Sequence, residues 1–456
     1  MQLTSQVVVV GGGPAGREAA RHAARRGADV VLVTGSLDSR NRLAIAAVRF
    51  LALEAPRAAQ AWEPEGPAPG PDYAPAMRET LIGALDMAAA NFDSQIADLR
   101  AIGVRVIEGR GRIAAPDIVS AAQRDGRTVY LHCCGIILAT GAQAFFGRES
   151  PRVLAPASMP ALTEIPESLI VLGSSPAALE LACFFAAYGV FVTVVGAGRP
   201  ALDFLDGELR DRVVDRAAEN QIRIFTEATA VSGTTDGRVD LLLSDNSHID
   251  ADCALPCGEG NYRTEGLGLE GPGVRVGLDG EVLADEHMRT NIPEIFAAGA
   301  ITGRHIPNIA IKQARIAAEN ALGGESAINY GLIPISVWFD PQVGAVGLTE
   351  EDGEKAGIAV SKTVLCADTA PEAQQWVKLV ADESTGRILG LHAVGSGAVE
   401  AVHMGALAMH CGATINDLAE LVCTDGAMAG CVSTAALRGR HPLPERLRPL
   451  VTGPDS

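Results

Sequence analysis

Long hydrophobic runs and an excess of positive charge are both missing from this 456-residue sequence. The longest largely apolar stretches, 170–172 and 190–195, are far too short to span a bilayer, so we expect no membrane association. Lysine and arginine total 37 against 55 acidic residues, a formal net charge of −18. This balance argues against nucleic acid or an anionic membrane surface as a partner, because both require clustered cations.

Regular spacing of cysteine and histidine is also absent. Nine cysteines without a repeated interval indicate reduced thiols in a cytoplasmic protein rather than a disulfide framework. The nine histidines show no metal-ligand spacing, so no metal site is expected. A strand is expected within a few residues of the N-terminus, which leaves no room for a signal peptide.

Glycine, in contrast, is abundant: 50 residues, which suits the tight strand-to-helix turns of α/β folds. Residues 6–34 follow the order strand, Gly-rich turn, Ala-rich helix, strand, and residues 169–195 repeat that order. A long helix is expected over about 76–102, and the proline-rich segment 54–75 is expected to be a loop. From residue 334 onward, antiparallel strands and helices at 398–411 and 415–421 are predicted.

The sequence therefore predicts an α/β protein with two Rossmann-like dinucleotide-binding domains and a C-terminal α+β domain. We expect the first dinucleotide-binding domain to comprise residues 1–150 and 262–330, and the second to comprise 151–261. Residues 331–456 then form the C-terminal domain.

The first Gly-rich turn has the spacing of a dinucleotide-binding motif. Gly11, Gly13 and Gly16 directly follow a buried strand and open a helix, with Pro14 and Ala15 between the last two glycines. The first glycine makes the turn, the second lets a diphosphate approach the backbone, and the third packs helix on strand. We therefore expect a dinucleotide at this turn.

The acidic residue that usually binds a ribose hydroxyl at the end of the next strand is missing. Thr34 occupies that position, so the ribose is held by hydroxyls or backbone, or it carries a phosphate. Arg40 and Arg42 are then either phosphate partners or solvated loop residues.

The second turn keeps small residues where the first has glycines. Gly173 is retained, Ser175 and Ala178 replace the second and third glycines, and Pro176 opens the helix. The strand that follows also ends without an acid, and Arg199 lies nearby. This combination favours a 2′-phosphorylated nicotinamide cofactor, NADP, over NAD.

Several motifs in fixed order give the sequence a clear resemblance to the flavoprotein disulfide reductases, the class of dihydrolipoamide dehydrogenase, glutathione reductase and mercuric reductase. Chance does not produce this order along nearly the whole chain. The motifs are the first turn, Ala139-Thr140-Gly141, the second turn, and the segments 290–299, 339–350 and 385–392.

The resemblance implies FAD on the first unit, NAD(P)H on the second, and a homodimer formed through residues 331–456. It also implies that Gly258 and the pair Gly299-Ala300 lie at the cofactors. Two anchors differ from the family pattern, since Glu259 replaces an arginine after Gly258 and Ala300 replaces the aspartate that binds the ribityl chain. The Ala300 replacement, together with Thr34, predicts FAD binding weaker than is usual in the family.

The redox cysteine pair of the family is also missing. Residues 35–55 contain no cysteine, and Ser36 and Asn41 fall where alignment places the pair, with Ile45 in place of the following lysine. Thiol–disulfide exchange requires a thiolate nucleophile, so we expect no disulfide reductase activity.

Two acidic residues remain as catalytic candidates. Glu180 matches an acid that partners the missing lysine, although a helix-surface glutamate needs no function. Asp425 falls where the family has the histidine of its His-Glu dyad, and it would be a poor base near neutral pH.

The remaining cysteines are predicted to be structural. Cys133 and Cys134 are adjacent in a strand and should point to opposite faces. Small core residues are the simplest interpretation of Cys183, Cys253 and Cys366, and packing is also favoured for Cys423 and Cys431.

The sequence thus predicts an NAD(P)H-dependent FAD oxidoreductase that passes hydride or electrons to a small acceptor, either quinone-like or a nicotinamide. The alternative is a repurposed scaffold with weakened or lost FAD binding that transforms a specialised small molecule. A non-catalytic nucleotide sensor is the third possibility.

Overall fold

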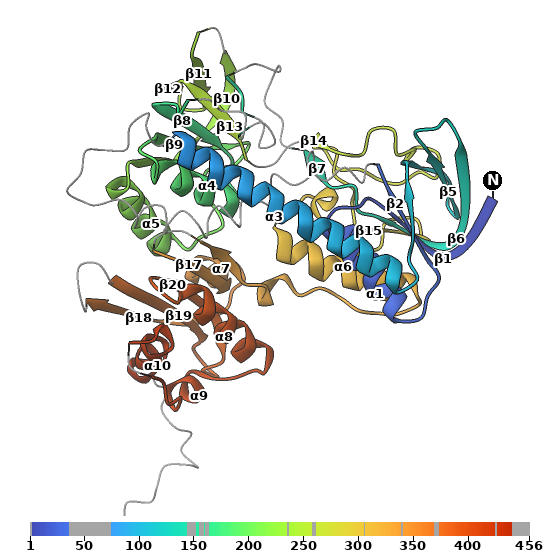
Figure 1. The fold of residues 1–456 in the computed structure, drawn as a ribbon. Helices are drawn as coiled ribbons and strands as arrows, with labels where there is room; N and C mark the ends of the chain where they lie inside the picture. The colour runs from blue at the N-terminus through green and yellow to red at the C-terminus, as the bar shows by residue number, and fades with distance from the viewer. Residues whose placement is uncertain are drawn as a thin grey trace, which may run out of the picture. The chain divides into compact units, whose positions relative to one another are not determined.

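The computed structural model describes residues 2–35, 74–143, 152–154, 159, 164–234, 237–257, 261–304, 306–338, 341–368, 374–424 and 426–439. The chain divides into two compact units (Figure 1). The first comprises residues 1–204 and 214–330, and the second comprises 205–213 and 331–456. The predicted boundaries near 150 and 262, inside the first unit, stay predictions.

The N-terminal sheet of the first unit has the strand order β3-β2-β1-β6-β5-β4, with β15 paired to β6. Its central strands are parallel, and apart from Thr34 their buried residues are apolar, which explains why the sequence shows continuous rather than alternating hydrophobic runs. The strands are β1 (Gln2–Val10), β2 (Val30–Thr34), β3 (Arg105–Glu108), β4 (Arg110–Ala115), β5 (Ile118–Ala122), β6 (Thr128–Leu138) and β15 (Ile295–Ala297).

Three helices accompany this sheet: α1 (Pro14–Arg25), α3 (Ala74–Ala101) and α6 (Pro307–Ala321). Figure 1 shows α1 and α6 side by side, and α1 also contacts α3. The helix predicted over 76–102 is confirmed as α3. The loop predicted over 54–75 lies, up to residue 73, outside the described residues.

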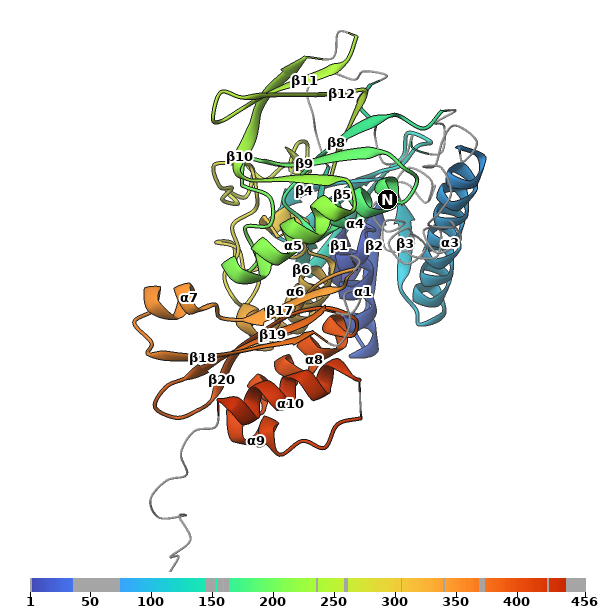
Figure 2. The ribbon, with the colours of Figure 1, turned by 90° about the vertical axis from the view of Figure 1, so that its left-hand side faces the viewer.

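The second sheet of this unit has the order β12-β11-β10-β9-β8-β13, with parallel central strands and an antiparallel edge (Figure 2). A two-stranded ribbon joins β7 (Ala142–Gln143) and β14 (Asn261–Tyr262). The sheet and its helices are β8 (Ser168–Leu172), α4 (Pro176–Ala186), β9 (Phe191–Ala197), α5 (Gly207–Glu219), β10 (Ile222–Thr234), β11 (Val239–Leu243), β12 (His248–Ala251) and β13 (Cys253–Pro256).

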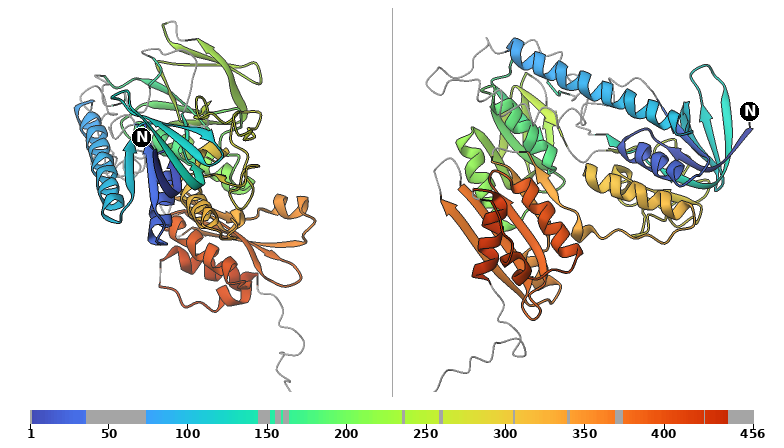
Figure 3. Two further views of the ribbon diagram at one scale, coloured as in Figure 1. Left: turned by 90° about the vertical axis from the view of Figure 1, so that its right-hand side faces the viewer. Right: turned by 60° about the horizontal axis from the view of Figure 1, so that its bottom comes forward.

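The second unit is an antiparallel sheet of order β16-β17-β20-β19-β18, against which α8 and α10 pack (Figure 3). This confirms the C-terminal α+β prediction, with the helix predicted over 415–421 ending at Ala419. The elements are β16 (Ile335–Val337), β17 (Val343–Gly347), α7 (Glu350–Lys355), β18 (Val360–Asp368), β19 (Gln374–Asp382), β20 (Ile388–Val394), α8 (Ala398–His410), α9 (Ile415–Ala419) and α10 (Met428–Arg438).

Among the described residues, we find no helix with the length and apolar character needed to cross a membrane.

Candidate functional site

The first glycine-rich turn joins β1 to α1, and backbone hydrogen bonds fix it on both sides. The N–H of Gly11 donates to the carbonyl oxygen of Val33 at 2.8 Å, and the N–H of Ala139 donates to that of Val10 at 2.8 Å. Gly11 has a φ of +121°, and a Cβ there would lie 2.2 Å from the carbonyl oxygen of Ala139. Backbone conformation and available space therefore both require glycine at this position.

The other two glycines of the turn are there for different reasons. A Cβ on Gly16 would lie 1.7 Å from the carbonyl oxygen of Gly11, so this glycine lets α1 pack against the turn. Gly13, just before Pro14, has an ordinary φ of −69°, and the nearest atom to a Cβ there, on Ala139, is 4.0 Å away. Within the described part of the chain, nothing requires glycine at 13. A diphosphate approaching the backbone does require it, so the turn fits this group.

Two further segments meet this turn at the carboxyl ends of β6 and β15. Gly299 has a φ of +83°, and a Cβ there would lie 2.8 Å from the Cβ of Ala15. Thr140 Oγ1 donates to the carbonyl oxygen of Arg263 at 2.8 Å, and the N–H of Arg263 donates to the carbonyl oxygen of Gly141 at 3.0 Å. Ligands of parallel sheets bind at this edge, so the predicted first-site residues lie where a dinucleotide is expected.

A buried glutamine that sequence reasoning missed fixes the β15 segment. Gln313 on α6 is 1% exposed, and its Oε1 accepts from the N–H of Gly299 at 2.8 Å. Its Nε2 donates to Tyr330 Oη at 2.9 Å. The amide therefore holds the backbone just before the 3₁₀ helix η4 (Ala300–Thr302). The only sequence indication was a polar residue on the buried face of a helix.

The two positions predicted to lack a family carboxylate differ in exposure. Thr34, the last residue of β2, is fully buried, whereas Ala300 at the start of η4 is half-buried. The structure therefore leaves more room for a polar group at Ala300 than at Thr34. Five residues discussed with this site lie outside the described residues: Ser36, Arg40, Asn41, Arg42 and Ile45.

The second turn, between β8 and α4, repeats the backbone hydrogen bonds of the first. The N–H of Gly173 donates to the carbonyl oxygen of Val195 at 2.9 Å, and the N–H of Cys257 donates to that of Leu172 at 2.6 Å. Cys257 thus closes this turn as Ala139 closes the first. Two strand–turn–helix units with the same closing bonds therefore lie in the first unit of the chain.

Side chains replace two glycines in this second turn. Ser175 is the N-cap of α4, its Oγ donates to the carbonyl oxygen of Cys257 at 3.3 Å, and Pro176 follows as the first helical residue. Ala178 is 1% exposed and packs where Gly16 packs in the first turn. Gly258 and Glu259, predicted to lie at this cofactor, are outside the described residues.

Glu180 is not on the helix surface, so that interpretation was wrong. It is 5% exposed, because α4 is a nearly all-apolar helix that is buried on most of its circumference. Burial, and after it the charge of Glu180, raise the pKa of the Cys257 thiol to about 12. A thiol with this pKa supplies no thiolate at neutral pH.

Arg199 follows β9 in an exposed turn beside the second site. Its side chain is 57% exposed, and its Nε lies 3.5 Å from Oδ2 of Asp203. A long cation that is largely solvated at this strand end can reach a ribose phosphate.

The other cysteines follow the predictions in part. Cys133 is buried and its neighbour Cys134 exposed, which confirms that they face opposite sides of β6, and Cys253 is buried. Cys366, predicted as a core residue, is exposed on the edge strand β18, where its Sγ accepts a hydrogen bond from Arg212 Nη2 at 3.4 Å. Cys183 is only half-buried.

The C-terminal catalytic candidate, Asp425, lies outside the described residues. Cys423 and Cys431 beside it are half-buried, and Cys431 Sγ donates to Gln375 Oε1 at 2.8 Å. In the described ranges, no group of histidine, cysteine, aspartate and glutamate side chains has the geometry to hold a metal ion.

A buried charge cluster in the second unit was not predicted. Lys378 is 2% exposed, and its Nζ lies 2.8 Å from Asp206 Oδ2 and 2.8 Å from Glu350 Oε2. Lys362 bridges Glu208 and Glu350 at 2.9 Å each. Burial opposes the charge of Lys378, but hydrogen bonds to these carboxylates outweigh it and raise its pKa above the ordinary value. Residues 205–213 belong to the second unit, so within that unit the cluster holds the first turn of α5 against the sheet.

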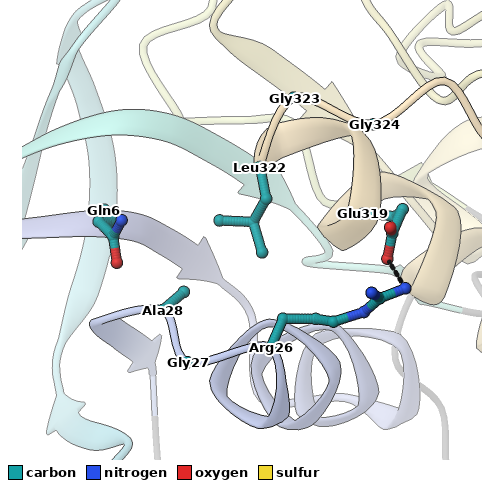
Figure 4. Close-up of a pocket in the computed structure, with 8 residues that line it drawn as sticks. All are labelled: Gln6, Arg26, Gly27, Ala28, Glu319, Leu322, Gly323 and Gly324. Atoms are coloured by element: carbon teal, nitrogen blue, oxygen red, sulfur yellow. Dashed lines mark ion pairs between the residues drawn. The ribbon is translucent and has the colours of Figure 1, made fainter.

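A surface hollow of about 460 Å³ lies at the carboxyl ends of α1 and α6 (Figure 4). Arg26 and Glu319 form an ion pair of 2.8 Å across it. The glycine-rich turn is at the opposite end of α1, so this hollow is not part of the nucleotide site. Its lining residues are Gln6, Arg26, Gly27, Ala28, Glu319, Leu322, Gly323 and Gly324.

Comparison with known proteins covers nearly the whole chain. Among curated proteins, the chain is 29% identical over 446 residues to mercuric reductase of Streptomyces lividans, covering 91% of each. It is 28% identical over 477 residues to NAD(P)H dehydrogenase (quinone) of Mycobacterium tuberculosis, covering 96% of this chain and 94% of the relative. It is 29% identical over 353 residues to mitochondrial dihydrolipoyl dehydrogenase 2 of Arabidopsis thaliana, covering 73% and 69%.

Solved structures agree with these sequence matches. LpdA from Mycobacterium tuberculosis superposes with a TM-score of 0.79 at 27% identity, covering 96% of this chain and 100% of that one. The Cu(II) complex of the flavoprotein disulfide reductase RclA from Escherichia coli has a TM-score of 0.80 at 21% identity and shows the shared fold alone. Residues 5–321 match the model of the pyridine nucleotide-disulphide oxidoreductases, and residues 333–436 match that of their dimerisation domain. The chain therefore belongs to the pyridine nucleotide-disulphide oxidoreductase family.

Proposed function

We propose that this protein is an NAD(P)H-dependent FAD oxidoreductase that passes hydride or electrons to a small acceptor without a redox disulfide. Family membership supports the flavin-dependent oxidoreductase activity, since the members of the family are flavin-dependent oxidoreductases. The absence of cysteine from residues 35–55, although both nucleotide turns are retained, supports a reaction without a redox disulfide.

The first turn would hold the diphosphate of FAD at Gly13, where the backbone is open. When bound, the flavin supplies the hydride-accepting chemistry, and the protein supplies position. The second turn would hold the nicotinamide cofactor, and Arg199 favours NADP there. Glu180 and Asp425 are proposed to act on protons or to shape the acceptor pocket.

Two buried cysteines of the first unit, Cys133 and Cys257, give no support to thiol chemistry. Burial raises the pKa of both Cys133 and Cys257 to about 12, so both remain protonated thiols at neutral pH. The relative named NAD(P)H dehydrogenase (quinone) supports a quinone-like acceptor for this chain. We further propose that the enzyme is a cytoplasmic homodimer that pairs through residues 331–456, the segment containing the match to the family's dimerisation domain.

One observation favours a second candidate, a scaffold with weakened or lost FAD binding and another reaction on a small molecule. Thr34 and Ala300 remove a carboxylate from each of two places where the family binds FAD hydroxyl groups. Each lost anchor weakens binding where its partner hydroxyl stays unpaired.

The absorbance spectrum of the purified protein separates the two candidates. A flavin spectrum that bleaches with NADPH, more slowly with NADH, and recovers with a benzoquinone supports the oxidoreductase. Lipoamide and glutathione disulfide should not restore the spectrum. Flavin that is neither present nor taken up on adding FAD, with NADPH still bound, would replace the first proposal with the second.

A further inference from the structure

A buried arginine touches the first nucleotide turn from behind. Arg17, in the first helical turn after Gly16, is 9% exposed. Its Nη1 donates to the carbonyl oxygen of Gly12 at 2.7 Å, and its Nε donates to Gln95 Oε1 on α3 at 2.9 Å. The guanidinium also lies over the ring of Phe92, 4.8 Å from its centre. One local group, the carbonyl of Gly12, and two groups of α3 thus fix this side chain.

The hydrogen bond to Gly12 has a consequence for the next amide. In a planar trans peptide, the carbonyl of Gly12 and the N–H of Gly13 point in opposite directions. Arg17, by holding that carbonyl, fixes the peptide plane with the Gly13 N–H directed away from the guanidinium. This N–H is one of the amides at a helix start that have no intrahelical acceptor. A cationic partner on the carbonyl also polarises the peptide and strengthens the N–H as a donor.

The second turn does not have this device. Leu179, fully buried, occupies the position that matches Arg17, and Ser175 holds that turn through its hydrogen bond to Cys257. An arginine is therefore no general requirement of the strand–turn–helix unit. It belongs to the turn that carries FAD in the proposed function.

We propose that Arg17 is a positioning residue that orients the Gly12–Gly13 peptide toward the diphosphate of the dinucleotide at the first turn. This inference rests on the proposed FAD site. On this proposal, contacts to the diphosphate supply part of the binding free energy that is lost where Thr34 and Ala300 replace carboxylates.

The test compares Arg17→Met with Gln95→Met in the full-length, flavin-stripped protein. Both variants remove one end of the Arg17–Gln95 hydrogen bond, but only Arg17→Met releases Gly12. We expect Arg17→Met to weaken FAD and ADP, titrated separately, by a similar factor of about 10 to 100. Gln95→Met should bind both within about threefold of the native protein, although both variants lower the thermal midpoint. Arg17→Lys, which still donates to Gly12, should recover part of the affinity.

Each other result overturns the inference in a distinguishable way. Native-like binding of FAD and ADP by Arg17→Met shows that the peptide needs no such support, and the FAD proposal stands. Equal losses in the Arg17 and Gln95 variants show that Arg17 acts only through packing against α3. If the native protein binds neither FAD nor ADP, the proposed function itself fails and the inference with it.

Discussion

The two nucleotide turns of the first unit share their backbone hydrogen bonds but differ in the side chains that support them. In each turn, the N–H of the first glycine donates to a carbonyl oxygen near the end of the strand that follows the helix. The residue after a third strand donates its N–H to the last carbonyl oxygen of the strand before the turn. The first turn packs helix against backbone at Gly16, where the second carries Ala178. The backbone pattern is thus fixed by strand and helix geometry, whereas the side chains around it are free to vary.

The acidic residue in the next turn of each helix shows the same contrast. Glu18 on α1 accepts from Arg315 Nε at 2.6 Å and from Arg21 Nη1 at 2.7 Å. Burial opposes its charge, but the two arginines outweigh it and lower the pKa of Glu18. Its counterpart Glu180 is 5% exposed on an apolar helix. Sequence position alone therefore does not decide whether such a glutamate is partly exposed beside two arginines or buried on an apolar helix.

The largest effect should come from exchanging the residues that pack each helix on its turn. Gly16→Ala places a Cβ 1.7 Å from a backbone oxygen, and we expect it to cost about 3 kcal/mol or more of unfolding free energy and to abolish flavin retention. Ala178→Gly should cost only about 1 kcal/mol, the helix-propensity difference, and keep nicotinamide binding. Urea unfolding and flavin content measure both. A well-tolerated Gly16→Ala would mean that the two turns are interchangeable.

Restoring a carboxylate should strengthen FAD binding at the first turn. Ala300 is half-buried, so Ala300→Asp can accept from a ribityl hydroxyl, and we expect about tenfold tighter FAD binding by fluorescence titration. Thr34 is fully buried, so Thr34→Glu alone should lower the stability of the flavin-free protein, and it should help only when combined with Ala300→Asp. Unchanged affinity in the double variant would show that the missing carboxylates do not limit binding.

The preference of the second site for NADPH over NADH should depend in part on Arg199. Arg199→Ala should reduce the preference for NADPH over NADH by about five- to tenfold, measured as the ratio of kcat/KM values for flavin reduction, because an exposed charge contributes modestly. Asp203→Asn, which removes the carboxylate 3.5 Å from Arg199, is the control and should leave the NADPH preference or raise it. An unchanged ratio in Arg199→Ala would show that this arginine does not contribute to nucleotide binding.

The smallest effect concerns Glu18. Because its pKa is lowered on folding, it stabilises the protein above the pKa of the unfolded chain, and this stabilisation is lost as pH falls through the folded value. Glu18→Gln should therefore lower the free energy of unfolding by about 1–2 kcal/mol at pH 7. It should have no effect in acid, where the Glu18 carboxyl is protonated in both the folded and the unfolded state. Chemical denaturation at several pH values tests this, and a cost that is independent of pH would contradict it.

Much of this protein follows from local sequence. The glycine turns, the buried parallel strands and the antiparallel C-terminal unit were predictable because each depends on residues close together in the chain. The motif order was enough to identify the family, and the missing cysteines at 35–55 need only counting.

Tertiary structure alone decided which polar groups are buried and what they hold. Arg17 is bonded to Gln95, Gln313 to Gly299, and Lys378 to Asp206, and each pair joins different elements. No periodicity marks such pairs, because a polar side chain on a helix or strand looks the same in sequence whether solvent or a distant partner satisfies it. Burial makes the partner obligatory, and burial is a property of the packed elements rather than of the local chain.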